Sequence, residues 1–107
     1  NLGLLYEELG KYKKAEPLIK QALEIRKNVL GLNHPDTASS LNNLGLLYEE
    51  LGKYKKAEPL YKQALEIKKK VYGLNHPHTV KVLNNLGELY QELGEYEQRV
   101  INFLKIQ

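Results

Sequence analysis

The sequence has no cysteine and no long apolar run. The absence of cysteine among its 107 residues excludes a disulfide scaffold, a thiolate nucleophile and any zinc or iron–sulfur centre held by cysteine. No apolar stretch approaches the roughly 20 residues that a membrane-spanning helix needs, and no signal peptide opens the chain, so we expect no membrane partner. These absences favour a cytoplasmic location, although the chain begins at Asn1 and a removed upstream segment could have carried targeting information.

Motifs of catalysis are also missing. There is no P-loop, no G-x-S-x-G elbow and no H-E-x-x-H pair. Adjacent carboxylates such as Glu49 and Glu50 diverge by about 100° on a helix and do not converge on one substrate atom. His76 and His78 flank a proline in a loop and lack further ligands for a metal. We therefore predict no enzyme, no catalytic residue, no cofactor and no metal site.

What the sequence does contain is an internal repeat. Residues 1–42 and 43–84 align without a gap and are identical at 34 of 42 positions. A third copy starts at Asn85 with NLGELYQELGEY and stops matching well after Tyr96. The period is thus 42 residues with about two and a half copies, from a recent duplication or an engineered array.

Within one period, the apolar residues recur at steps of three and four, which predicts two antiparallel helices in every copy. The first should run from about Asp36 to Leu51 and stop near Gly52, and the second from about Tyr54 to Tyr72, ending at Gly73.

Prolines mark the openings of the predicted helices. Pro35 and Pro77 suit the first position of a helix, where a missing N–H costs nothing. Pro17 and Pro59 fall early in the second helices, where we expect a bent or loosened turn.

A helical wheel separates two faces of the first helix. The expected core stripe is Leu41, Leu44, Leu47, Tyr48 and Leu51. The opposite face gathers Ser39, Asn42, Asn43, Leu46, Glu49 and Glu50. Amides around an exposed aliphatic residue suggest a contact surface on this second face.

The spacing of small and large residues resembles the tetratricopeptide repeat. The landmarks of one copy are Leu41, Leu44, Gly45, Tyr48, Gly52, Tyr54, Ala57, Tyr61 and Ala64. The 42-residue period and the GLNHP connection are most similar to the kinesin-light-chain type of this repeat. The resemblance implies an all-α fold, a right-handed α-solenoid of antiparallel helical hairpins with a concave groove that holds peptides or partner proteins. The whole chain, 1–107, would be one array: a partial repeat 1 over 1–31, repeat 2 over 36–73, and a degenerate repeat 3 over 78–107.

The candidate peptide-binding groove follows from the first helices. Its residues are Asn1, Leu4, Asn42, Asn43, Leu46, Lys81, Asn84 and Asn85. Stacked repeats would form a ladder of asparagine amides, each with a donor and an acceptor for an extended peptide backbone. The structural alternatives are that an asparagine bonds to the neighbouring helix, and that Leu46 packs against it.

Some members of the family hold a partner's C-terminal carboxylate with basic residues and asparagine. Asn43 and Lys81 match two such positions, but Asn85 and Leu4 depart from the pattern, so the resemblance does not carry a full clamp. Glutamates on the same face favour basic or neutral segments over acidic tails. The 16 basic residues, against 13 acidic ones, lie mainly on the second helix and its approach, where we interpret them as a solvated face. That face also leaves a nucleic-acid partner as a disfavoured alternative.

The C-terminal segment is unusually apolar. Val100, Ile101, Phe103, Leu104 and Ile106 would be exposed on a lone terminal helix. We read the segment as a shortened, degenerate second helix, and hypothesise either that the chain is a fragment of a longer array or that copies associate end to end. The predicted function is a protein–protein interaction module. The alternatives are a structural or self-assembling array without a dedicated ligand, and a basic nucleic-acid-binding surface.

Overall fold

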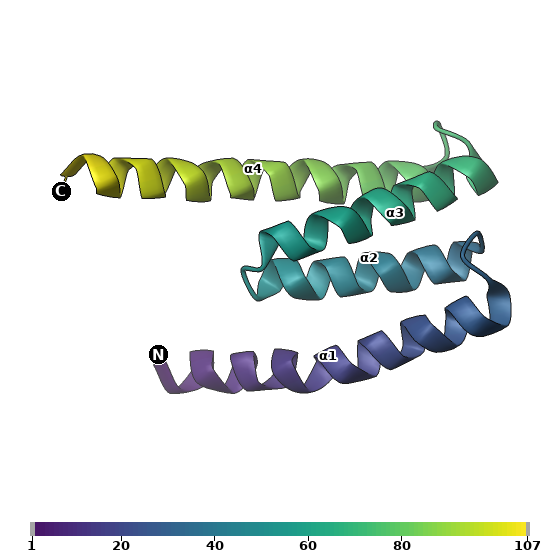
Figure 1. The fold of residues 1–107 in the computed structure, drawn as a ribbon, viewed down its shortest axis with the longest axis horizontal. Helices are drawn as coiled ribbons and strands as arrows, with labels where there is room; N and C mark the ends of the chain where they lie inside the picture. The colour runs from purple at the N-terminus through teal and green to yellow at the C-terminus, as the bar shows by residue number, and fades with distance from the viewer. Residues whose placement is uncertain (1, 107) are drawn as a thin grey trace.

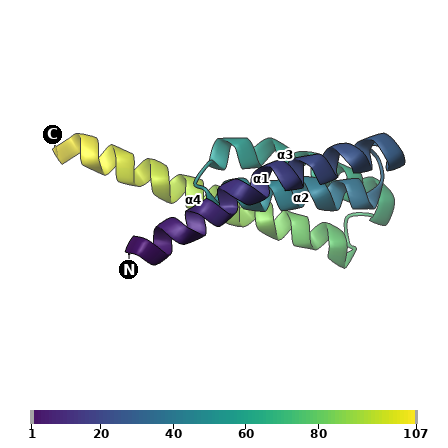
Figure 2. The same cartoon turned by 90° about the horizontal axis from the view of Figure 1, so that it is seen from below.

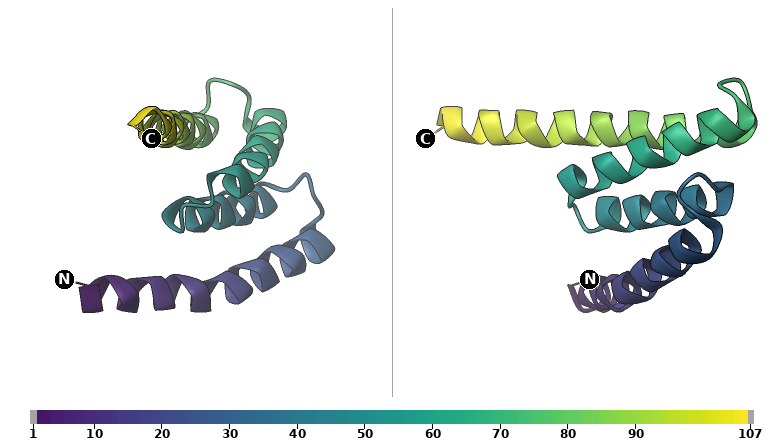
Figure 3. Two further views of the ribbon diagram at one scale, coloured as in Figure 1. Left: turned by 60° about the vertical axis from the view of Figure 1, so that its left-hand side comes forward. Right: turned by 45° about the vertical axis from the view of Figure 1, so that its right-hand side comes forward.

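Four helices build the molecule. The computed structural model describes residues 2–106, with side chains described over 7–105. The helices are α1 (Leu2–Leu30), α2 (Pro35–Glu50), α3 (Tyr54–Tyr72) and α4 (Pro77–Ile106). They lie side by side in antiparallel order with α1 and α4 at the two edges (Figure 1). Successive helices are rotated relative to one another, so that the stack twists (Figure 3). The predicted all-α solenoid is confirmed.

The interior hairpin α2–α3 follows the sequence prediction closely. Each predicted boundary lies within one residue of the observed one. Gly52 ends the first helix with φ +76°, a left-handed conformation that favours glycine. The backbone N–H of Lys53 then donates to the carbonyl of Tyr48 at 2.8 Å. A glycine at this position lets the chain reverse within three residues.

A histidine caps the start of α2, as the His-Pro spacing suggests. The backbone N–H of Asp36 donates to Nδ1 of His34 at 3.0 Å, and Pro35 is the first helical residue. The next loop repeats this arrangement, with the N–H of His78 donating to Nδ1 of His76 at 3.1 Å. The loop histidines are thus helix caps.

The prediction of two helices in every copy is wrong at both ends of the chain. Helix α1 passes through Gly10 and helix α4 passes through Gly94 without a break. Residues 2–18 and 44–60 are identical, yet only the second segment contains a turn. Local sequence therefore does not decide whether this glycine ends a helix.

Packing decides it instead. The turn at Gly52 is held because α2 and α3 lie against each other along their lengths, between α1 and α4. In the described part of the chain, α1 packs on α2 alone, so a turn at Gly10 has no second pair of packed helices to hold it. Continuing the helix keeps its backbone hydrogen bonds.

The C-terminal half of α4 has a further reason to stay straight. Val100 and Ile101 stand where the interior repeat has Glu58 and Pro59. An apolar stripe with alternating steps of four and three residues consequently runs through Gly94 to the end of α4: Val82, Leu86, Leu89, Leu93, Tyr96, Val100 and Phe103. The segment predicted as a separate, degenerate second helix is part of α4.

Proline is tolerated inside two of the helices. Pro17 lies within α1, which curves along its length (Figure 1), and Pro59 lies in the second turn of α3. A missing N–H and the proline ring favour such curvature.

The core lies between α2 and its neighbours. Leu41, Leu44, Leu47 and Tyr48 of the predicted stripe are buried and Leu51 is half-buried. Gly45 permits the closest approach, because a Cβ at this position would lie 2.7 Å from the ring of Tyr61 on α3.

Candidate functional site

A cavity of about 390 Å³ opens between α2, the end of α3 and the start of α4. Its lining is mostly polar and consists of Pro35, Asp36, Ser39, Asn42, Asn43, Lys68, Tyr72, His78, Lys81 and Val82. Three helices contribute because the second helix of a repeat ends where the first helices of that repeat and the next begin.

The structure places the predicted groove residues in different settings. Asn42, Asn43 and Lys81 line the cavity. Leu46 and Asn84 are exposed on the surfaces of α2 and α4. The predictions for Asn1 and for the side chain of Leu4 fall outside the described residues.

Two members of the asparagine ladder bond to each other. Nδ2 of Asn85 donates to Oδ1 of Asn42 at 3.0 Å, joining α4 to α2. Asn42 is buried and Asn85 half-buried. This pair realises the structural alternative in which an asparagine bonds to the neighbouring helix, and Asn43 is the exposed amide beside it.

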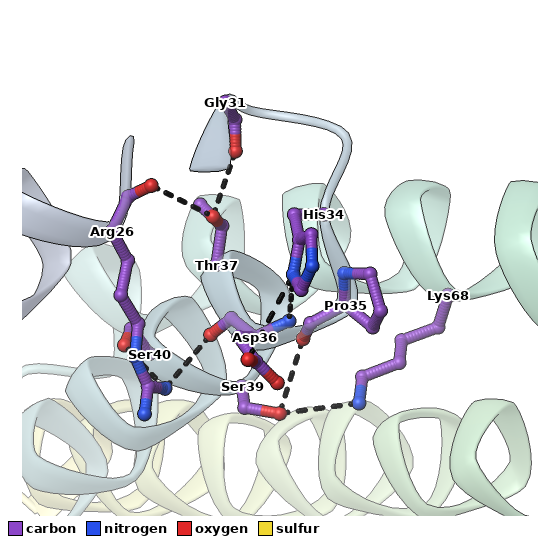
Figure 4. A network of polar contacts seen from close by, with 9 residues as sticks. All are labelled: Arg26, Gly31, His34, Pro35, Asp36, Thr37, Ser39, Ser40 and Lys68. Carbon is purple, nitrogen blue, oxygen red and sulfur yellow. Dashed lines mark hydrogen bonds and ion pairs between the residues drawn. The ribbon is translucent and has the colours of Figure 1, made fainter. Parts of the chain in front are cut away.

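Lys68 is not part of a solvated face, contrary to the sequence interpretation. Only 8% of the residue is exposed, and its Nζ donates to Oγ of Ser39 at 3.2 Å inside the cavity (Figure 4). The ammonium also lies 5.6 Å from the ring centre of Tyr72. Burial lowers the pKa of Lys68, against the opposing effect of the Asp36 carboxylate. A buried cation thus faces the cavity.

The equivalent residue in the first copy makes different contacts. It is Arg26, whose Nη1 donates to the backbone carbonyl of Asp36 and to Oγ of Ser40 on the next first helix (Figure 4). The equivalent of Ser40 on α4 is Val82, whose side chain offers no acceptor. Lys68 instead bonds to Ser39 of its own repeat.

Differences between the two near-identical repeats gather at this cavity. Seven of its ten lining residues occupy positions at which the first two copies differ: Asp36, Ser39, Lys68, Tyr72, His78, Lys81 and Val82. The residues that build the hairpin are repeated unchanged. Sequence reasoning missed Lys68 and Tyr72, and this clustering of differences is the signal that could have identified them.

Two aromatic rings, those of Tyr72 and His78, line the cavity, and a third, that of His76, lies against Tyr72. The ring of Tyr72 stacks on His76 with centroids 4.4 Å apart, and lies 5.0 Å from the ring of His78. Tyr72 is half-buried and His78 is exposed. Aromatic rings beside a buried cation can contact both apolar and charged groups of a ligand.

The opposite end of the groove is acidic. Glu88 and Glu92 follow Asn85 at steps of one and two helical turns along α4. A hydrogen bond with Glu49, together with burial and repulsion from Glu49, Glu50 and Glu88, raises the pKa of Glu92 to about 7. The groove therefore has a basic end at the cavity and an acidic end about two turns away.

Two other kinds of site, a metal centre and a membrane span, are absent from the described part of the chain. Over residues 2–106, no group of three or more histidine, aspartate and glutamate side chains could hold a metal ion. None of the described helices is both long enough and apolar enough to cross a membrane.

Comparison with known proteins identifies similar sequences and structures. A family model described as tetratricopeptide repeat matches residues 1–70 and 59–98. A nucleotide-binding leucine-rich repeat (NLR)-like protein of the fungus Hyaloscypha variabilis is 49% identical over 42 residues, which are 39% of this chain and 4% of that protein. The crystal structure of BtubC (BKLC) from P. vanneervenii superposes with a TM-score of 0.72 and 32% identity, over 85% of this chain and 36% of that one. The chain thus spans a small part of the proteins that it matches.

Proposed function

This chain belongs to the tetratricopeptide repeat family, and we propose that it docks an extended segment of a partner protein in the groove formed by α2 and α4. Repeats of this family generally mediate protein–protein interaction and are typically not enzymes. The kinesin-light-chain-like character of the repeat agrees with the similarity to BtubC. The predicted groove residues Asn43, Leu46, Lys81 and Asn84 remain part of the proposal.

One observation carries this proposal. In two copies that are otherwise nearly identical, the substitutions are concentrated around one polar cavity on the groove. A purely structural spacer needs the same packing in each copy and gains nothing from a distinct cavity. Substitutions between duplicated repeats are expected at a surface that binds a partner.

The charges define the chemistry of the docked segment. Lys68 and Lys81 face or line the cavity, whereas Glu88 and Glu92 lie at the far end. We expect a carboxylate of the partner at the cavity and a basic or neutral side chain near the glutamates. This refines the sequence prediction that the groove favours basic or neutral segments, because the glutamates occupy one end of it. We expect the exposed side-chain amide of Asn43 to form hydrogen bonds with the backbone of the docked segment.

The experiment is a peptide-display selection on the intact chain, followed by fluorescence anisotropy with the enriched peptides. Lys81→Ala and Asn43→Ala remove exposed cavity residues without touching the core. Lys69→Ala is the matched control, because Lys69 is exposed on α3 and does not line the cavity. We expect each cavity variant to weaken binding at least tenfold, and the control to leave it unchanged.

Two results would contradict the proposal. If no peptide is enriched, or if the enriched peptides bind the cavity variants as tightly as the original chain, docking in this groove fails. If affinity falls steeply with salt for any polyanion, including nucleic acid, the basic surface is the better explanation.

A second candidate function is end-to-end self-association. It is favoured by the large apolar side chains exposed on both edge helices, among them Leu18, Ile25, Phe103 and Leu104. Contiguous exposed apolar residues mark interaction surfaces in soluble proteins. Light scattering of the chain over a range of concentrations tests whether any association occurs.

A further inference from the structure

Helix α4 exposes the face that α3 covers on α2. Along α2, Ala38, Leu41, Leu44, Gly45 and Tyr48 are buried. Their equivalents on α4 are all more accessible, and the contrast is clearest for Leu41 and Leu83, which are 1% and 38% exposed. The other equivalents are Val80, Leu86, Gly87 and Tyr90. Helix α4 thus lacks one neighbour, the second helix of its own repeat.

Helix α1 exposes the complementary face. Where α3 packs on α2, Ile67 of α3 is only 5% exposed to solvent, whereas its equivalent Ile25 on α1 is 54% exposed. Ala64 is buried and its equivalent Ala22 is exposed. Leu18 shares this face, four residues before Ala22. Helix α1 therefore lacks a first helix packed against it, in the way that α2 packs against α3.

The exposed faces of α4 and α1 correspond to the two sides of the α2–α3 interface: α4 matches α2, and α1 matches α3. Residues 11–30 of α1 and 53–72 spanning α3 are identical at 16 of 20 positions. We propose that α1 of a second copy packs on α4 as α3 packs on α2, so that copies join head to tail into a continuous solenoid. This inference rests on the second candidate function, self-association, and specifies its geometry.

We call the contact between α4 of one copy and α1 of the next the joint. The residues that differ between the joint and the α2–α3 interface are compatible with this packing. In the α2–α3 hairpin, the hydroxyl of Tyr61 donates to Oε1 of Glu49 at 2.7 Å. At the joint, Ile19 replaces Tyr61 and Gln91 replaces Glu49. Both partners of the hydrogen bond change together, so the joint contains no phenol without an acceptor and no carboxylate opposite Ile19; the polar side chain that remains, Gln91, is uncharged.

The room at Gly87 and the charges at the joint are also compatible with the proposed packing. Gly87 takes the place of Gly45, and a Cβ built there meets nothing within 4 Å, which leaves room for Ile19 of the second copy. At the joint, Arg26 takes the place of Lys68 and Lys81 takes that of Ser39, which brings two like charges to one region. Arg26 is already held within its own chain by Asp36 and Ser40.

The straight ends of the edge helices do not block the joint. The N-terminal end of α1 and the C-terminal end of α4 both project beyond the α2–α3 turn on the same side of the molecule (Figures 1 and 2). Antiparallel packing of α1 on α4 would lay these two ends alongside each other. Such a heterologous contact does not close on itself, so assemblies should grow with concentration.

The test uses one blocking substitution on each face. Gly87→Lys and Ala22→Lys place a charge at exposed positions, where neither disturbs the monomer. Gln63→Lys and Gln21→Lys are the matched controls, because each makes the same unit change of charge at an exposed position away from the joint: Gln63 lies on α3, and Gln21 points elsewhere on α1 than its neighbour Ala22. The measurement is the weight-average mass by light scattering and sedimentation equilibrium.

We expect the original chain and both controls to form species that grow beyond the dimer. Each blocked variant should lose at least about tenfold in association constant. An equimolar mixture of the two should form a heterodimer and stop, because Gly87→Lys retains its α1 face and Ala22→Lys retains its α4 face.

Three results would contradict the proposal, and each excludes a different part of it. A chain that stays monomeric up to several hundred micromolar overturns both self-association and this geometry. Association that survives either substitution overturns the geometry alone. Loss in both variants without a heterodimer in the mixture shows a symmetric contact, which also overturns the head-to-tail joint.

Discussion

The contact between Gly45 and Tyr61 gives the sharpest stability prediction. In Gly45→Ala, the new Cβ would lie 2.7 Å and 2.9 Å from Cε1 and Cδ1 of the Tyr61 ring. That ring is fully buried, and its hydroxyl is tied to Glu49, so it cannot move aside cheaply. Overpacking of this kind costs about 1–3 kcal/mol, whereas alanine gains up to about 1 kcal/mol over glycine in helix propensity. We expect a net loss of about 1–2 kcal/mol.

The equivalent glycine on α4 supplies the control. Gly87→Ala brings the same gain in helix propensity, and its Cβ meets nothing within 4 Å, so it should stabilise the chain by about 0.5–1 kcal/mol. The difference between the two variants therefore isolates the steric cost. Urea denaturation at a concentration where the chain is monomeric measures both. If Gly45→Ala is as stable as Gly87→Ala, the close approach does not constrain the hairpin and the reasoning fails.

Three further predictions concern polar groups. The raised pKa of Glu92, about 7, means that the fold opposes its charge, so stability falls as pH rises from 4.5 through 7. Glu92→Gln should then gain about 1 kcal/mol at pH 8 and nothing at pH 4, and equal gains in urea titrations at both pH values would refute the cause. Asn85→Ala leaves the buried amide oxygen of Asn42 without its donor and should cost about 1–3 kcal/mol by urea denaturation, whereas a loss below 0.5 kcal/mol would show that the bond is immaterial. Because burial lowers the pKa of Lys68, the original chain gains stability as pH rises toward 10. Lys68→Met should flatten that slope in thermal melts, and an unchanged slope would contradict the assignment.

The interior of the fold could be predicted from the sequence because its signals are local and repeated. Glycines, prolines and the apolar spacing placed α2 and α3 within one residue of their observed bounds. The edge helices could not be predicted in this way. The segment that turns at Gly52 has an identical twin around Gly10 that does not turn, and the difference lies in what packs on each.

The candidate site was only partly accessible from sequence. A helical wheel placed Asn43 and Lys81 on the groove face, and both line the cavity. The wheel could not show that Asn42 and Asn85 would bond to each other, since the two residues are 43 positions apart and lie on different helices. Nor could it show that Lys68 turns inward to Ser39, because its equivalent Arg26 bonds to the next first helix instead.

The twin segments around Gly10 and Gly52 also bear on how such an array lengthens. If a complete hairpin were attached covalently beyond either edge, the continuous helix at that edge would have to break at its glycine to form an interior hairpin like α2–α3. Elongation within one chain would therefore exchange helical backbone around one glycine for new side-chain packing. Association of separate copies needs no such exchange, because their edge helices stay continuous and lie alongside each other.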